Sequence, residues 1–228
     1  MKKDIERQYT TMAKNYDETI KKIIPEYNKI IKTMVELLPF DKNQAIDVLD
    51  IGCGTGTVAA HIKKKFFHSA ITCLDPTQKM LLAAKKKMKN YLGIKYVQTT
   101  IEQFPFKEKY HAVCASMVFQ NIQTKKEKRS IFKKIFKTLN DDGVFLYFGP
   151  VKGSNERIEE MYMKKWSTFL QKSFSLNSSK NDWVATYKEK DTQDTLLNEL
   201  DLLTTCGFKS VDIITKNNNF ALFTASKS

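Results

Sequence analysis

Apolar and polar positions alternate along the chain in a pattern that predicts strands separated by helices. Short apolar runs, typical of buried strands, occur between longer segments in which apolar residues recur every three or four positions, as on one face of a helix. Helices of this length between successive strands produce crossover connections, so the pattern predicts an α/β fold with a parallel sheet. The predicted strands are 46–51, 70–74, 95–98, 111–117 and 144–148, the predicted helices are 57–67, 77–91 and 125–139, and a turn is expected at 140–143.

The last part of the chain follows a different pattern. A predicted helix over 192–206 precedes two predicted strands, 210–216 and 220–226, which Asn217-Asn218-Asn219 separate. Asn tolerates left-handed backbone, so this connection indicates an antiparallel hairpin rather than another crossover. We therefore expect a doubly wound sheet that is mostly parallel and ends in a C-terminal antiparallel hairpin.

Two segments lie outside the strand and helix alternation. Residues 1–40 carry an amphipathic helical pattern that Pro25 interrupts, which predicts a second helix starting there. Residues 151–190 contain both tryptophans and are too long for an ordinary loop. We expect one domain over 1–228, made of an N-terminal helical cap (1–40), a core (41–150), an inserted helical lid (151–190) and a last helix with its hairpin (191–228).

Charge suggests a nucleic-acid partner at first sight, because the 228 residues carry a formal charge of +13. However, only three of the 38 basic residues are arginine, the side chain that binds phosphates and base edges bidentately. Lysine runs at 63–65, 85–87 and 125–137 fall on predicted crossover helices, whose outer faces are solvated. Nucleic acid remains the minority alternative to a small-molecule partner. Lysines of the lid are expected to attract an anionic acceptor: Lys164, Lys165, Lys172, Lys180, Lys188 and Lys190.

Targeting and metal signals are lacking in the sequence. The first 20 residues have no apolar signal-peptide core, and no apolar run approaches the length that spans a bilayer. The four cysteines form no CxxC pair, which argues against a zinc site and a redox motif. We expect a cytoplasmic protein with reduced thiols, no membrane contact and no metal, either monomer or homodimer.

The strongest chemical signal is Val48–Gly56, VLDIGCGTG, in which an apolar strand runs into three glycines before a helix. Glycines permit a tight turn and close approach of a ligand, and a helix N-terminus favours negative charge. Asp75 ends the next strand 19 residues after Gly56, where an acid accepts hydrogen bonds from ribose hydroxyls. The alternative is a purely structural role, in which Asp75 caps the N-terminus of the following helix.

The segments VLDIGCGTG, CLDPTQKML, FPFKEKYHAVCASMVFQNI and IFKKIFKTLNDDGVFLY together resemble class I S-adenosylmethionine-dependent methyltransferases, which have a Rossmann-like fold. The resemblance implies that S-adenosylmethionine is the cofactor, with Asp75 on its ribose. Thr100 replaces the Asp with which many members contact the adenine amine, leaving the Thr100 hydroxyl and the Ile101 backbone there. The implied cofactor-binding residues are Asp50, Gly52, Cys53, Gly54, Gly56, Asp75, Pro76, Met80, Thr100, Ile101 and Ser116.

Both ends of the chain resemble a subgroup that includes carboxy-S-adenosylmethionine synthases and small-molecule methyltransferases. The leader QYTTMAKNYDETIKKIIPEYNKI and the final GFKSVDIITKNNNFALFTASK carry this resemblance. The synthases are expected to carry an Arg before the last helix for the extra carboxylate, and Lys180-Asn181-Asp182 stands there instead. This difference favours ordinary S-adenosylmethionine.

Methyl transfer is an in-line displacement, which depends on positioning and desolvation and needs a base only when the nucleophile is protonated. None of the three histidines is expected at the site, which favours transfer to nitrogen or sulfur. Gln120 follows a strand end, where ligands bind. The catalytic candidates are Tyr16, Asp17 and Gln120, and the substrate-contact candidates are Tyr9, Asn121, Phe148, Trp166, Trp183 and Tyr187.

The favoured hypothesis is thus a small-molecule methyltransferase. An RNA-modifying methyltransferase, a carboxy-S-adenosylmethionine synthase-like enzyme and a non-catalytic cofactor-binding protein are the alternatives.

Overall fold

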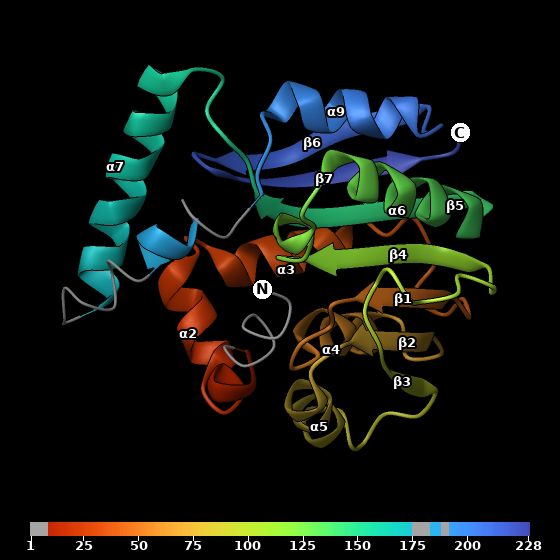
Figure 1. Cartoon of the computed structure of the whole chain (residues 1–228). Helices are drawn as coiled ribbons and strands as arrows, with labels where there is room; N and C mark the ends of the chain where they lie inside the picture. The colour runs from red at the N-terminus through yellow and green to blue at the C-terminus, as the bar shows by residue number, and fades with distance from the viewer. Residues whose placement is uncertain (1–8, 175–182, 188–191) are drawn as a thin grey trace.

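A single sheet of seven strands organises the molecule. The computed structural model describes residues 9–174, 183–187 and 192–228. The strand order is β3-β2-β1-β4-β5-β7-β6, with β7 antiparallel to both of its neighbours and the other pairs parallel (Figure 1). This is the predicted doubly wound α/β sheet with a terminal antiparallel hairpin. The strands are β1 (Asp47–Ile51), β2 (Ala70–Asp75), β3 (Ile94–Gln98), β4 (Tyr110–Ser116), β5 (Leu139–Pro150), β6 (Ser210–Asn217) and β7 (Phe220–Ser226).

Helices cover both faces of the sheet because successive strand residues point to opposite sides. In β5, Leu146 and Phe148 pack in one hydrophobic core, whereas Phe145 and Tyr147 pack in the other. The first core includes residues of α3 (Tyr27–Glu36), α4 (Thr57–Lys65) and α5 (Gln78–Lys87), and the second includes residues of α6 (Lys125–Thr138) and α9 (Leu196–Thr205). The result is three layers, helix, sheet and helix.

The start of β5 differs from the prediction. Residues 140–143, predicted as a turn, lie within β5, which begins at Leu139 rather than at Val144. Leu139 pairs with Tyr110 and Val144 pairs with Ala112, so the intervening residues form an irregularity within the ladder. The turn-forming residues Asn140–Gly143 therefore form a bulge, and β5 is paired with β4 both before and after it. The predicted bounds of the other strands agree with the structure to within one residue.

The cap and the lid contact each other beside the carboxyl ends of the strands. The cap contains α2 (Tyr16–Ile23) and α3, and Pro25 lies between them, two residues before α3 begins. The lid contains α7 (Glu156–Ser173), whose Trp166 Nε1 donates a hydrogen bond of 2.7 Å to the Ile23 carbonyl at the end of α2. Among the described residues, no helix combines the length and apolar character that would carry it across a bilayer.

Two lysines that were expected on outer helix faces are buried instead. Lys63 is 2% exposed, and its ammonium donates to the carbonyl oxygens of Phe67 and Ser69, which follow the end of α4. Lys128 is 8% exposed and forms an ion pair with Glu199 of α9, which also accepts a hydrogen bond of 2.7 Å from Tyr147. Lysine buries its long stem readily when its charged end finds oxygen partners.

Candidate active site

The site lies where the direction of winding of the sheet reverses, between β1 and β4. Their carboxyl ends adjoin, which is the position where open α/β sheets bind ligands. Gly52, Gly54 and Gly56 follow β1 with φ values of 61°, 53° and 78°, a region that glycine adopts at little cost. A Cβ on Gly52 would lie 2.5 Å from Val118 Cγ2, whereas one on Gly54 would meet, among the described residues, only Tyr16 Cε1, at 3.9 Å. The loop thus leaves room for a ligand above Gly54.

A cavity opens above this loop and contains most of the residues that the sequence assigned to the cofactor. It encloses about 990 Å³, including space open to solvent. Leu74, Ile101 and Ile122 give it apolar walls, and Asp75 and Glu102 carry its carboxylates. A nucleoside, with a flat apolar base and a polar sugar, suits this mixture. The expected cofactor residues in its lining are Gly52, Gly54, Asp75, Pro76, Met80, Thr100, Ile101 and Ser116.

Asp75 is held at the rim of this first cavity by backbone N–H groups. Its Oδ2 accepts from Gly54 N at 2.9 Å, and its Oδ1 accepts from Thr77 N at 2.8 Å. Burial raises the pKa of Asp75, and these N–H groups partly oppose the rise. The N-cap of α5 is Thr77 and Asp75 lies two residues before it, so this contact differs from the helix cap that the alternative expected. The Thr77 side chain also hydrogen-bonds this carboxylate. An ionised carboxylate has about four acceptor sites, so a hydroxyl donor of a ligand can still bind.

Three other cofactor candidates lie outside the cavity lining. Asp50 is 1% exposed and accepts a hydrogen bond from the Ala59 N–H, while its Oδ2 has no partner among the described residues. Burial raises the pKa of Asp50 to about 8. Cys53 is buried within the loop itself, and a Cβ on Gly56 would lie 2.6 Å from Met88 Cε. Gly56 therefore allows close packing of the loop on the segment around α5 instead of approaching the ligand.

A second cavity adjoins the first and is formed mainly by the cap and the lid. It encloses about 690 Å³, again including space open to solvent. Its described lining contains no charged side chain. Four residues line both cavities: Tyr9, Tyr16, Met117 and Asn121. The expected site residues in the second cavity are Tyr9, Tyr16, Gln120, Asn121, Trp166, Trp183 and Tyr187.

Of the catalytic candidates, Tyr16 and Gln120 line a cavity, whereas Asp17 does not. Burial of its hydroxyl, with nearby tyrosine and Asp groups, raises the pKa of Tyr16 well above its usual value. Tyr16 therefore remains protonated at neutral pH and is a donor rather than a base. Gln120 is 5% exposed and belongs to the short 3₁₀ helix Phe119–Asn121 after β4.

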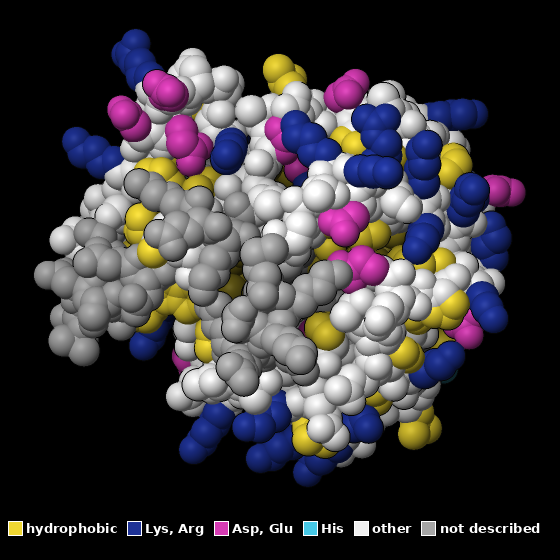
Figure 2. All heavy atoms as spheres, in the orientation of Figure 1, with side chains coloured by type: hydrophobic (Ala, Val, Ile, Leu, Met, Phe, Trp, Pro, Cys, Tyr) yellow, Lys and Arg dark blue, Asp and Glu magenta, His cyan; other side chains and the backbone are white. Residues whose placement is uncertain are grey.

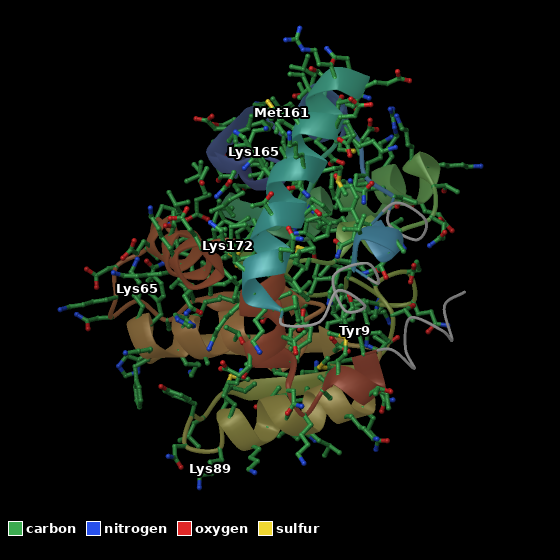
Figure 3. The ribbon with its side chains drawn as sticks, turned by 90° about the vertical axis from the view of Figure 1, so that its left-hand side faces the viewer. Tyr9, Lys65, Lys89, Met161, Lys165 and Lys172 are labelled. Carbon is green, nitrogen blue, oxygen red and sulfur yellow. The ribbon has the colours of Figure 1, made fainter. Side chains whose placement is uncertain are left out.

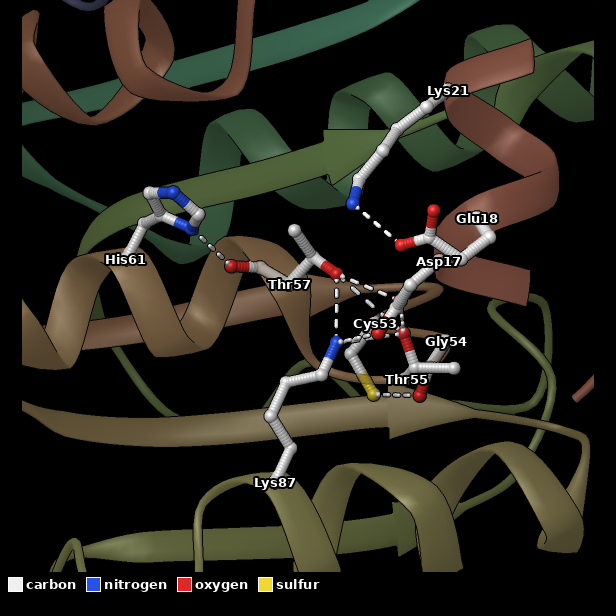
Figure 4. A network of polar contacts seen from close by, with 9 residues as sticks. All are labelled: Asp17, Glu18, Lys21, Cys53, Gly54, Thr55, Thr57, His61 and Lys87. Atoms are coloured by element: carbon white, nitrogen blue, oxygen red, sulfur yellow. Dashed lines mark hydrogen bonds and ion pairs between the residues drawn. The ribbon is translucent and has the colours of Figure 1, made fainter. Parts of the chain in front are cut away.

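Asp17 instead connects α2 to the glycine loop, as Figure 4 shows. Its Oδ2 lies 2.7 Å from Lys87 Nζ of α5, and its Oδ1 accepts from Thr55 Oγ1 at 2.5 Å. Burial acts to raise the pKa of Asp17, but the hydrogen bonds and the Lys87 charge outweigh it and lower that pKa. A stable carboxylate in this ion pair positions the cap and is unsuited to accepting a proton.

Phe148 and the lid lysines also lie apart from the site. Phe148 is 1% exposed in the core and packs near Phe220, with ring centroids 6.1 Å apart. Lys164, Lys165 and Lys172 are exposed on α7, and Figure 3 shows Lys165 and Lys172 along its outer side. Lys180, Lys188 and Lys190, with Asn181 and Asp182, lie outside the described residues. On the face drawn in Figure 2, basic side chains are spread around the surface with acidic ones between them.

Some residues that line the two cavities were not predicted from the sequence. Met117 and Val118 line the first cavity, and Met117 also lines the second. Met117 has a φ of 58°, which is uncommon outside glycine and marks a constrained backbone at the junction of the cavities. Their position directly after β4 was the available signal, since it is the position that identified Gln120. The segments that complete the second cavity, around Ile20, Pro150 and Phe220, offered none.

Comparison with known proteins identifies similar sequences and folds. Residues 48–143 match the model of a methyltransferase domain. Over 99% of the chain and 97% of the relative, the sequence is 21% identical to the carboxy-S-adenosyl-L-methionine synthase of Nautilia profundicola. It is 30% identical to malonyl-[acyl-carrier protein] O-methyltransferase 2 of Ilyobacter polytropus over 64% of the chain, spanning 53% of that relative.

Among solved structures, the complex of DhpI with SAH has a similar fold. The TM-score is 0.68 at 12% identity, with 96% of this chain and 93% of that chain covered. Residues 48–143 therefore form a methyltransferase domain, and the chain has the fold and the relatives of the S-adenosylmethionine-dependent methyltransferases.

Proposed function

We propose that the protein transfers the methyl group of S-adenosylmethionine to a small molecule held in the second cavity. The observation that carries this proposal is the pair of adjoining cavities with a common wall of four residues. One cavity has the glycine loop and carboxylate that suit a nucleoside, and the other has an uncharged aromatic lining. A donor and an acceptor placed in them would meet at the common wall, which is the arrangement that group transfer requires.

The residues present fit this cofactor. Asp75 would accept hydrogen bonds from the ribose hydroxyls, and Met80 and Ile101 would contact the adenine. The Oδ2 of Asp50 is buried beside the glycine loop without a partner among the described residues. This carboxylate would pair with the ammonium of the amino-acid end once the proton that burial keeps on Asp50 is displaced. When bound, S-adenosylmethionine supplies an electrophilic methyl group: as the acceptor lone pair bonds to its carbon, the carbon–sulfur bond breaks and its electron pair stays on sulfur.

The chain itself contributes positioning and exclusion of water. Tyr16 lines both cavities, and Asp17 fixes the start of α2 to the glycine loop through Thr55 and Lys87. The cap and lid surround the second cavity with apolar side chains, which removes water from the reacting atoms. The described lining of this cavity contains no His, Asp or Glu that would act as a base. An acceptor nitrogen or sulfur with an available lone pair suits this lining, and an amine would lose its proton to water afterwards.

Calorimetry with S-adenosylmethionine and its demethylated product tests the proposal. We expect both to bind the wild-type chain and Asp75→Ala to weaken the affinity at least tenfold, because two hydrogen bonds to a carboxylate are lost. The matched control is Asp47→Ala, since the Asp47 side chain is 58% exposed at the other end of β1. Absence of binding to the wild-type chain would contradict the proposal.

A carboxy-S-adenosylmethionine synthase activity is the second candidate. Similarity over nearly the whole of both chains to such a synthase favours it. The described lining of both cavities contains no Lys or Arg that would pair with an additional carboxylate. Mass spectrometry of the cofactor after incubation with candidate substrates separates the two: loss of a methyl group supports methyl transfer, and gain of a carboxylate supports the synthase.

Methylation of RNA is a further alternative, which the charge of +13 keeps open. Phosphate-driven binding must weaken steeply as salt is raised. Titration of tRNA at two salt concentrations should therefore show no tight, salt-sensitive complex if the acceptor is a small molecule.

A further inference from the structure

Two of the aromatic side chains that line the second cavity have their polar atoms occupied by backbone carbonyls. Trp166 Nε1 donates to the Ile23 carbonyl at 2.7 Å, and Tyr187 OH donates to the Val151 carbonyl at 3.2 Å. The Trp166 and Tyr187 rings are 5.3 Å apart between centroids and inclined by 53°. With their donors held by backbone oxygens, these rings offer apolar faces to a ligand, a surface that flat aromatic molecules contact well.

Gln120 lines the second cavity, and its side chain carries a buried acceptor. Its Nε2 donates to the Met117 carbonyl at 2.9 Å. Since a carbonyl oxygen only accepts, this contact fixes the amide nitrogen toward Met117 and turns Oε1 the other way. Oε1 is buried and has no hydrogen-bond partner among the described residues. Buried polar atoms without a partner are rare and require an explanation.

The backbone of Gln120 is equally well fixed. Its carbonyl oxygen accepts from Thr192 N at 2.8 Å and from Thr192 Oγ1 at 3.0 Å. Hydrogen bonds thus fix both the side-chain amide and the backbone of Gln120, as specific recognition of a ligand requires.

The described lining of the second cavity has no charged side chain that would pair with an ionised acceptor. A carboxylate or ammonium entering the second cavity would lose its hydration and find no opposite charge in the described lining. Lys164, Lys165 and Lys172 are exposed on α7 and do not line this cavity. The expected attraction of an anion by the lid lysines stays a prediction.

We propose that the second cavity binds a flat, uncharged aromatic acceptor that donates an N–H or O–H hydrogen bond to Gln120 Oε1. This inference rests on the proposed methyltransferase function and names the class of its substrate. Gln120 is the specificity-determining residue, because a molecule of the same shape without the donor leaves Oε1 unpaired. Trp166, Trp183 and Tyr187 surround the ring of the acceptor.

The test uses three probes with the full-length protein saturated with the demethylated cofactor product, and measures affinity by ligand-observed NMR. Indole and benzofuran have the same shape, but only indole has an N–H donor, and indole-5-carboxylate adds a negative charge. We expect indole to bind the wild-type protein at least tenfold more tightly than benzofuran, and the carboxylate to bind more weakly than indole.

Two variants assign the effect to Gln120. In Gln120→Met the preference for indole over benzofuran should fall to within about twofold, because the acceptor oxygen is removed while the volume is nearly kept. The matched control is Gln123→Met, since Gln123 hydrogen-bonds the Asn121 carbonyl nearby but lines neither cavity. It should keep the preference. Thermal unfolding and binding of the cofactor product verify that each variant is folded.

Different results would contradict the substrate inference and the proposed function. Equal binding of indole and benzofuran, a preference that survives in Gln120→Met, tighter binding of the carboxylate, or no binding of any probe would overturn the inference. If Gln120→Met does not fold, the wild-type comparison of the three probes still decides it. Failure of the wild-type chain to bind the cofactor product would instead overturn the proposed function.

Discussion

The two cavities are built in opposite ways. Apart from Tyr9 and Tyr16, the first cavity is lined by residues 51–122, which follow one another through β1, β2, β3 and β4. The second draws on five separate parts of the chain: the cap, the turn after β4, the end of β5 at Pro150, the lid and the start of β7 at Phe220. The first therefore depends on local backbone geometry, whereas the second depends on the packing of the cap against the lid. Substitutions should reveal this difference.

The largest expected effect is a pH dependence that originates under the first cavity. In the unfolded chain Asp50 loses its proton near pH 3.8, and in the folded chain near pH 8. Between these values unfolding releases a proton, so the free energy of unfolding falls as pH rises, by at most about 1.4 kcal/mol per pH unit. The raised pKa of Asp75 acts in the same direction. Urea unfolding from pH 5 to 9 should show this decline.

Asp50→Asn should make that decline shallower, because the amide has no proton to lose. Asp201→Asn, at an exposed position of α9, is the control and should leave the slope unchanged. Parallel slopes for wild-type and Asp50→Asn would rule out Asp50 as the cause.

The next largest effect is expected when one methyl group is added to the glycine loop of the first cavity. Gly52→Ala places a Cβ 2.5 Å from Val118 Cγ2 at a φ of 61°, so the loop or Val118 must move. We expect the affinity for S-adenosylmethionine to fall about 100-fold, or about 2.7 kcal/mol, in calorimetry. Gly93→Ala is the matched control, because Gly93 also has a positive φ (72°) but lines neither cavity. It should reduce stability and leave the affinity unchanged; an equal loss of affinity in both variants would refute the assignment.

A smaller effect is expected at the joint between cap and lid. Trp166→Phe removes the donor to the Ile23 carbonyl, so a buried oxygen loses its partner at a cost of about 1–3 kcal/mol. Thermal unfolding should show this loss, and acceptor binding should weaken. Cofactor affinity should stay within about twofold, because Trp166 does not line the first cavity. A larger loss of cofactor affinity would mean that the two cavities are not built independently.

The smallest effect is expected at Asp17. The side chains of Asp17 and Lys87 are 40% and 28% exposed, so solvent screens their ion pair and Asp17→Asn should cost less than about 1 kcal/mol. The pKa of Asp17 is lowered, so its contribution is present above pH 3.8 and is lost as pH falls below that value. Glu18→Gln is the control, since Glu18 pairs with Lys21 on the surface of the same helix. Cofactor affinity should drop a few-fold in Asp17→Asn alone, as calorimetry would detect.

The same contrast explains what could be predicted from the sequence. Gly52, Gly54 and Asp75 were identifiable because a strand, a glycine turn and a terminal acid are close in the sequence and require particular residue types. Ile20, Pro150 and Phe220 were not, because apolar residues from distant segments reveal nothing of their meeting until the fold is known.

The burial of single lysines could not be predicted either, because it also depends on distant segments. Lys63 and Lys128 lie in runs of lysine that look solvated, and the carbonyl and carboxylate oxygens that allow their burial come from tertiary structure. Likewise, the turn chemistry of Asn140–Gly143 predicted a break, whereas the pairing of Leu139 with Tyr110 extends the strand.

The common wall formed by Tyr9, Tyr16, Met117 and Asn121 has a thermodynamic consequence. A ligand that shifts this wall in one cavity alters the space available in the other. The resulting coupling free energy is reciprocal: whatever factor the cofactor contributes to acceptor affinity, the acceptor must contribute to cofactor affinity. In the proposed reaction the first cavity would lose a methyl group at this wall, so the coupling would differ before and after turnover, and that difference would bias which product leaves first.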